Sequence, residues 1–170
     1  MSQRNQFVIT ARGEIGTIEG PKDNETKYGK FTNANFLPWC GSFVNWCADQ
    51  VGLKIPNCVS TLAGAKAFEK QGRFQKAEVA VPEVGDLAFF DFPADSLDRI
   101  SHIGIVARVD YDKGIVWVIE GNTSPDKKGD QRNGGQVCQK QRAYKAKNGG
   151  KLKKSIPVYI VGFGKPKFKD

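Results

Sequence analysis

The chain has four cysteines, whose thiolates are strong nucleophiles, and Cys40 stands out among them by its surroundings. It lies in the stretch Pro38–Cys47, where apolar residues recur at close to helical spacing. Pro38 suits the first position of a helix, because its missing N–H would be unpaired there in any case. The sequence therefore predicts Cys40 in the first turn of a buried amphipathic helix that ends near Gly52. The dipole and free N–H groups at such a position lower the pKa of a thiol and favour the nucleophilic thiolate.

A thiol nucleophile needs a base, and the chain offers one histidine, His102. Residues 101–109 and 115–122 read as two strands joined by a tight turn at 110–114. In that hairpin His102 lies roughly opposite Asn122, and Glu120 is one step along on the same face. A carboxylate there can accept the second N–H of the imidazole and stabilise the imidazolium. Cys40, His102 and Glu120 are thus candidates for nucleophile, base and orienting acid.

Each of these residues could also have a purely structural role. Cysteine is among the most buried residue types, so Cys40 also fits a simple core position. A lone histidine at the start of a strand is often a surface or capping residue, and Glu120 and Asn122 also fit the polar end of a strand. The joint pattern is harder to explain in this way than any one member, because a charge at the end of an apolar strand is costly without a partner.

The elements that must position these residues follow one another as helices first and strands second. This order predicts an α+β domain with helices packed on one face of an antiparallel sheet. A single domain over residues 1–164 and a loose basic tail over 165–170 are expected. The long segments 123–135 and 145–154 read as loops. The predicted helices are 7–19, 38–51 and 60–70, the last capped by Ser60, and the predicted strands are 84–92, 101–109, 115–122, 136–144 and 157–163.

Composition narrows the class of partner and cofactor. A formal charge of +8 over 170 residues favours an anionic partner, such as nucleic acid, a membrane surface or a cell-wall polymer. No recognised nucleic-acid motif or basic helix occurs, so nucleic acid is not expected. The four cysteines lack C-x-x-C spacing and the acidic residues near Asp23 lack the EF-hand pattern, so neither a metal nor another cofactor is predicted. With no signal peptide and no run of membrane-spanning length, synthesis as a cytoplasmic chain without membrane insertion is expected.

Taken together, these motifs resemble the CHAP family, the cysteine- and histidine-dependent amidohydrolases and peptidases with a papain-like fold. The resemblance implies cleavage of an amide bond of bacterial peptidoglycan, as in phage endolysins, either as an N-acetylmuramoyl-L-alanine amidase or as an endopeptidase. It implies Cys40 as nucleophile, His102 as base, Glu120 as orienting acid and Asn122 as the polar residue beside that acid. The motifs that carry it are Pro38–Val44 around the cysteine, Gly85–Leu87, Ser101–Val106, Glu120–Asn122 and the upstream Glu19–Pro21 and Lys27–Gly29.

Several finer expectations follow from this resemblance. A lysin of this kind would act at the bacterial cell wall after release from the host cytoplasm, with a virion-associated lysin carried on the particle as the alternative. A monomer is the default expectation. Tyr28, Phe31 and Trp39 are expected to line the substrate groove, with core packing as the alternative for Trp39, and Asn35 is the nearest side-chain candidate to help hold the oxyanion. The competing interpretations are a non-catalytic basic module that binds wall polymer or nucleic acid, and a papain-like effector hydrolase.

Overall fold

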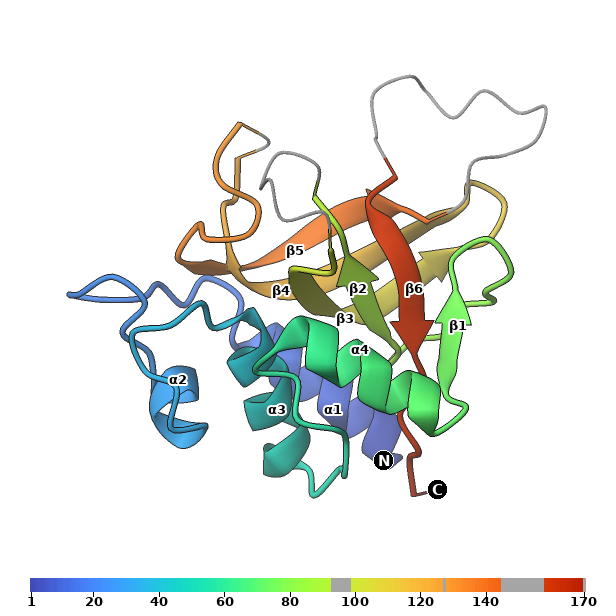
Figure 1. Ribbon diagram of the computed structural model, residues 1–170, viewed down its shortest axis with the longest axis horizontal. Coiled ribbons are helices and arrows are strands. Elements are labelled where there is room, and N and C mark those ends of the chain that lie inside the picture. The colour runs from blue at the N-terminus through green and yellow to red at the C-terminus, as the bar shows by residue number, and fades with distance from the viewer. Residues whose placement is uncertain (93–98, 127, 145–157, 170) are drawn as a thin grey trace.

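The computed structural model of the chain describes residues 1–92, 99–126, 128–144 and 158–169 (Figure 1). Within these residues, helices precede strands and all paired strands of the sheet are antiparallel, which confirms the predicted α+β class. The helices are α1 (Gln3–Gly13), α2 (Lys27–Phe31), α3 (Cys40–Gln50) and α4 (Thr61–Lys70), and the strands are β1 (Phe74–Lys76), β2 (Leu87–Phe90), β3 (His102–Asp110), β4 (Ile115–Thr123), β5 (Gln136–Ala143) and β6 (Ile160–Gly164).

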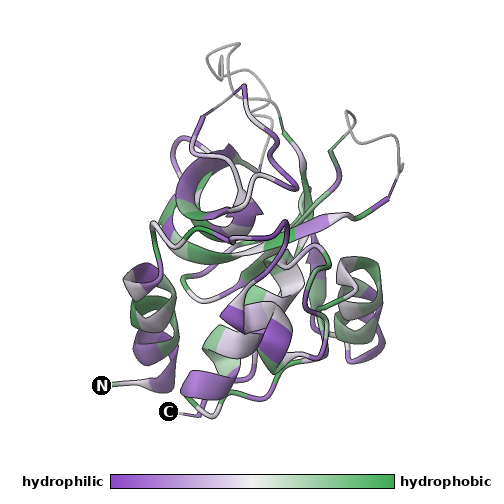
Figure 2. Cartoon of the chain, turned by 90° about the vertical axis from the view of Figure 1, so that its left-hand side faces the viewer, coloured by the Kyte–Doolittle hydropathy of each residue, from purple (hydrophilic) through white to green (hydrophobic). Residues whose placement is uncertain are grey.

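The sheet has the strand order β1-β6-β2-β3-β4-β5, and it buries both of its faces. Leu87 and Phe89 of β2 belong to the core between the sheet and the helices, whereas Ala88 and Phe90 belong to a second core on the other face. This alternation follows from the two-residue period of a strand. Hydrophobic and hydrophilic bands accordingly alternate along the strands and the helices (Figure 2). The predicted packing of helices on one face of the sheet is confirmed. The second core, on the other face, was not predicted.

The β3–β4 hairpin positions the candidate base and acid. Near the site its register pairs Ile105 with Ile119, as the predicted turn requires. Near the turn the register is shifted by one residue, because a β-bulge between Val106 and Arg108 adds a residue to β3. The register near the site is therefore the predicted one for Ile105 and Val106, whereas His102 itself pairs with Phe90 of β2.

Element boundaries differ from the sequence-based expectation in several places. Helix α1 begins four residues earlier than predicted, because Ser2 caps it by accepting a hydrogen bond from the Asn5 N–H, and it ends at Gly13 and not at residue 19. Neither α2 nor β1 was predicted. Ser60 caps α4 as expected, through a bond from the Ala63 N–H. The predicted loop 145–154 and the start of the predicted strand 157–163 lie outside the described residues.

The C-terminal segment is packed against the domain, so the expected loose end is wrong for residues 165–169. The Lys165 ammonium pairs with the Asp86 carboxylate, whose side chain is almost fully buried. Phe168 lies against Phe7, with 6.1 Å between ring centroids, and Arg4 stacks over the Phe168 ring at 4.6 Å. The two ends of the chain accordingly lie side by side (Figure 1).

Candidate active site

Cys40 is the first residue of α3, as its predicted place in the first turn requires. The first bond of the helix runs from the Phe43 N–H to the Trp39 carbonyl, so the N–H groups of the first three helical residues have no partner within the helix. Pro38 lies just before the helix and not at its first position, which corrects the predicted start. The thiol therefore sits at the positive end of an 11-residue helix, where negative charge is stabilised.

A close backbone approach fixes the start of α3. A Cβ atom on Gly41 would lie only 1.7 Å from the carbonyl oxygen of Cys58, so no larger residue fits there without moving the backbone. On the same helix, Asn45 accepts a hydrogen bond from the Cys58 N–H at 2.7 Å and donates one to the Pro56 carbonyl at 3.1 Å. The segment 56–58 thus holds α3, and with it Cys40, in one position.

His102 begins β3 and is fully buried. Its Nε2 lies 3.0 Å from Oε2 of Glu120, which confirms the predicted proximity of the two side chains. Among the described residues Nδ1 has no hydrogen-bonding partner, so it is the ring nitrogen available to the Cys40 thiol. A Cβ atom on Gly104 would lie 2.7 Å from Cγ of Glu120, and the glycine therefore makes room for this carboxylate.

Glu120 is fully buried and held by a cation as well as by His102. Arg142 of β5 donates from Nε to Oε1 and from Nη2 to Oε2, each at 2.7 Å. This bidentate geometry is among the strongest hydrogen-bonded pairings available to a carboxylate. Burial alone would raise the pKa of Glu120, but the charge and hydrogen bonds of Arg142, followed by those of His102, lower it to about 2. Glu120 is therefore an anion throughout the physiological pH range.

The pKa of His102 is set by opposing effects. Burial disfavours the imidazolium and lowers the pKa, whereas the neighbouring Cys40 and then Glu120 raise it, with a net rise to about 9. Near neutral pH the imidazole is therefore protonated when the thiol is ionised. His102, Glu120 and Arg142 alternate in charge, and this arrangement stabilises the imidazolium beside Cys40.

Because His102 is the only histidine in the chain, its titration can be followed without ambiguity by NMR of the imidazole ring. We expect a midpoint near 9 in the native protein and a lower midpoint in Cys40→Ala, where the thiolate charge is absent. Since the folded-state pKa of His102 is raised above the ordinary 6.5, the stabilisation from the charged imidazole is complete below about 6.5 and lost as pH rises toward about 9. A native midpoint at or below 6.5 would contradict the proposed ion pair.

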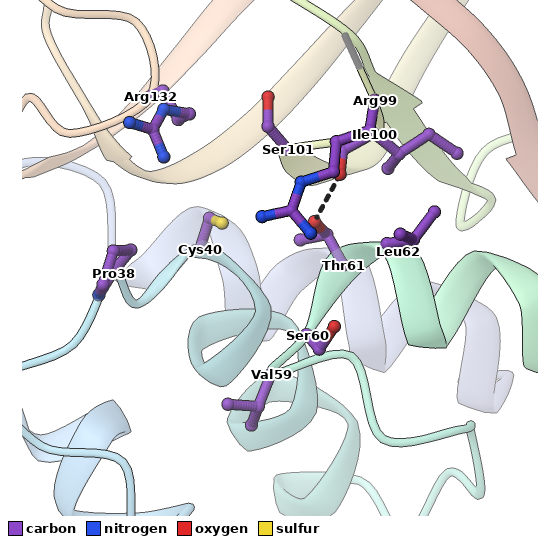
Figure 3. Close-up of a pocket in the computed structure, with 10 residues that line it drawn as sticks. All are labelled: Pro38, Cys40, Val59, Ser60, Thr61, Leu62, Arg99, Ile100, Ser101 and Arg132. Carbon is purple, nitrogen blue, oxygen red and sulfur yellow. Dashed lines mark hydrogen bonds between the residues drawn. The ribbon is translucent and has the colours of Figure 1, made fainter. Parts of the chain in front are cut away.

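A cleft of about 130 Å³ opens beside Cys40 (Figure 3). Its walls are Pro38 and Cys40 at the start of α3, residues 59–62 at the start of α4, residues 99–101 before β3, and Arg132 from the connection between β4 and β5. The Thr61 hydroxyl donates to the Ile100 carbonyl at 3.4 Å and joins two of these walls. The thiol is thus placed where a small part of a substrate can reach it.

Asn122 lies two residues after Glu120 in the sequence, but its side chain forms its hydrogen bonds with the surrounding loops. It is buried with a φ of 56°, a left-handed conformation that asparagine tolerates better than most residues. Its Nδ2 donates to Asn24 and Asn133, and its Oδ1 accepts from the Gly135 N–H at 3.0 Å. The structure therefore gives Asn122 a positioning role between two loops, and no hydrogen bond joins it to His102 among the described contacts.

The residues expected to line a substrate groove lie elsewhere. Tyr28 and Trp39 are fully buried and stack on one another with 5.3 Å between ring centroids, so the prediction that they present a substrate surface is wrong. Trp39 Nε1 donates to Glu19 at 2.7 Å, which identifies it as a core anchor of α3. Phe31 is 44% exposed but is not part of the cleft lining, and neither is Asn35, whose Oδ1 accepts from the Thr26 N–H.

The sequence analysis did not predict Arg142, which forms the two shortest hydrogen bonds to Glu120. A weak signal exists, because Cys138, Lys140 and Arg142 alternate along one face of β5 and Cys138 pairs with Glu120. That signal becomes readable only when β5 is known to lie beside β4. A buried carboxylate requires a partner of opposite charge, so the general need for such a cation was predictable although its identity was not.

The family model of the CHAP domain matches residues 32–122, which is more than half of the chain. The chain belongs to the CHAP domain family. The match includes Cys40, His102 and Glu120, whereas Arg132 and Arg142 lie beyond it. Membership in this family indicates a hydrolase of the amidohydrolase or peptidase type.

The fold of this CHAP protein is also similar to a solved structure, the crystal structure of Ly7917, with a TM-score of 0.52 and 12% sequence identity. That match covers 96% of this chain and 62% of the Ly7917 chain, so the CHAP protein spans less than two thirds of the length of Ly7917. At this identity the likeness concerns the fold alone. No curated protein sequence matches the chain.

The described part of the CHAP protein contains no group of three or more histidine, cysteine, aspartate or glutamate side chains arranged to hold a metal ion. Over the same residues, no helix is both long enough and apolar enough to span a membrane.

Proposed function

We propose that this CHAP protein is a cysteine-dependent peptidoglycan hydrolase that cuts an amide bond of the bacterial cell wall, either as an N-acetylmuramoyl-L-alanine amidase or as an endopeptidase. The observation that carries the proposal is the placement of Cys40 at a helix N-terminus, in a cleft, beside a buried His102–Glu120 pair. The family supports amide hydrolysis in general, and its members commonly act on peptidoglycan.

The proposed reaction is acyl transfer in two steps. The Cys40 thiolate attacks the amide carbonyl carbon, and the N–H groups at the start of α3 stabilise the oxyanion that forms. The C–N bond then breaks as the protonated His102 gives its proton to the leaving amine, which leaves a thioester on Cys40. His102 next takes a proton from water, the hydroxide adds to the thioester, and the C–S bond breaks to release the carboxylic acid.

Charge supports the proposed substrate. The formal charge of +8 favours accumulation on an anionic wall whose stem peptides and polymers carry carboxylates and phosphates. We propose that the protein acts as a monomer, in the manner of an endolysin, at the wall of a bacterium in whose cytoplasm it was made.

Purified protein is expected to clear a turbid suspension of Gram-positive cell walls and to release new amino groups without new reducing ends. Amines without reducing ends identify an amide hydrolase, and mass spectrometry of the fragments then identifies the bond. Release of reducing ends would instead indicate a glycosidase. Binding to walls without release of either group would identify a non-catalytic binding module.

A further inference from the structure

Two aromatic rings lie against the charged side chains of His102, Glu120 and Arg142. Phe90 ends β2 and is the cross-strand partner of His102, and Phe92 follows it by two residues. Both rings belong to the second core, on the face of the sheet away from the helices. They stack on one another with 5.6 Å between centroids and 10° between planes. The proposed reaction assigns no part to either ring.

Each ring contacts both cationic side chains of the site. The imidazole of His102 lies 5.5 Å from the Phe90 ring and 5.6 Å from the Phe92 ring, measured between centroids. The guanidinium carbon of Arg142 lies 5.4 and 5.5 Å from the same two centroids. An aromatic ring attracts a cation within about 6 Å of its centroid, and more strongly where water is excluded. The two rings therefore favour positive charge at His102 and at Arg142 together.

Phe92 also belongs to the apolar layer that separates these charges from solvent. Its side chain is only 5% exposed, and those of His102 and Glu120 are fully buried. Phe92 packs edge-on against Tyr159 with 5.2 Å between ring centroids, and the Asp91 N–H donates to the Tyr159 carbonyl at 3.0 Å. The segment that carries the ring is thus fixed by the backbone. Hydrogen bonds between charged groups are stronger in such a dry environment than in water.

We propose that Phe92 is a positioning residue of the active site, whose ring holds the His102 imidazolium and the Arg142 guanidinium in place and keeps water from Glu120. Phe90 makes the same contacts, but it lies within β2, so its replacement would disturb the sheet as well. Phe92 lies just beyond the strand. The inference rests on the proposed function for its activity measurement, whereas titration of His102 tests it whatever the substrate is.

The charged groups around His102 come from four parts of the chain. Burial lowers the pKa of His102, whereas Cys40 at the start of α3 and Glu120 of β4 raise it. Arg142 of β5 is bonded to Glu120, and the carboxylate of Asp130, between β4 and β5, also interacts electrostatically with the imidazole. All of these groups remain when the aromatic ring alone is removed, so a shift in the His102 titration then reports the ring.

The test is Phe92→Leu, which keeps the position apolar and removes the ring. The midpoint of the His102 titration, followed by NMR, is expected to fall by about 0.5 to 1 unit, because the imidazolium loses the ring and water weakens its bond to Glu120. Release of amino groups from cell walls is expected to fall about 10-fold, as part of the contribution of a well-oriented acid and base. The loss is expected in kcat and not in KM, since Phe92 is not among the described residues that line the cleft.

Two further variants at the same position separate the ring from the volume of the side chain. Phe92→Met, which also lacks a ring, is expected to give the same fall in the His102 midpoint. Phe92→Tyr retains a ring and is expected to keep the native midpoint and rate. A native midpoint in folded Phe92→Leu or Phe92→Met would overturn the positioning role.

The matched control is Phe163→Leu, the same substitution at a fully buried phenylalanine of the same core. Phe163 packs edge-on against Tyr144 and lies on β6, which β2 separates from β3. Its replacement is expected to lower the temperature of thermal unfolding and to leave the His102 midpoint unchanged. An equal fall of the midpoint in this control would assign the effect to general loosening of the core and overturn the inference. If native protein releases no amino groups from walls, the proposed function fails, while the titrations still decide the role of Phe92.

Discussion

Replacing Cys40 with alanine is expected to lower amide hydrolysis by about 10⁴-fold or more while the protein remains folded. The substitution removes the nucleophile and leaves the cleft, His102 and Glu120 in place. Release of amino groups from cell walls measures the activity, and circular dichroism with thermal unfolding measures the fold. Equal clearing by native protein and Cys40→Ala would exclude Cys40 as the nucleophile.

Cys47→Ala is the matched control, because Cys47 lies two turns further along the same helix. Burial raises the pKa of Cys47 well above its ordinary value and that of Cys58 to about 12, so both remain protonated and unreactive. Of the four cysteines, only Cys40 is among the described residues that line the cleft. Iodoacetamide at neutral pH is therefore expected to alkylate Cys40 first, and Cys47→Ala is expected to keep its activity per folded molecule.

Replacing Arg142 with methionine is expected to reduce the free energy of unfolding by about 3–5 kcal/mol, because it leaves a buried carboxylate without its cation. Arg142 is almost fully buried and makes both of its short bonds to Glu120. Urea unfolding measures the loss. The double variant Glu120→Gln/Arg142→Met removes both charges and is expected to be more stable than Arg142→Met alone. A double variant that is less stable than Arg142→Met would show that the uncompensated charge is not the cause.

The same substitution distinguishes a positioning role of Arg142 from a merely structural one through its pH dependence. Arg142 helps to hold the pKa of Glu120 near 2, below its ordinary 4.5, so the stabilisation from this carboxylate is present above about 4.5 and lost as pH falls toward about 2. Without Arg142, burial dominates and the pKa of Glu120 rises. The acid limb of the pH–rate profile is then expected to move to higher pH, whereas Arg142→Lys is expected to restore it in part. An unchanged acid limb in folded Arg142→Met would contradict the positioning role.

The sequence by itself determined the family and the central pair of the site. One histidine in the whole chain left a single candidate base, and the short turn between β3 and β4 made the register of that hairpin predictable. Glu120 was found because the register places it on the face of His102. The predicted start of the Cys40 helix, at Pro38, lies close to its observed start at Cys40, since apolar spacing is a local property of the chain.

Only the tertiary structure decided which groups surround this pair. Arg142 reaches Glu120 because β5 pairs with β4, and the long connection 124–135 does not set that register in advance. The same long-range packing buries Tyr28 and Trp39, which the sequence assigned to a groove, and brings Arg99 and Arg132 to the two sides of Cys40. Local patterns report periods of two or 3.6 residues, whereas these contacts join segments far apart in the chain and depend on how the sheet and helices pack as a whole.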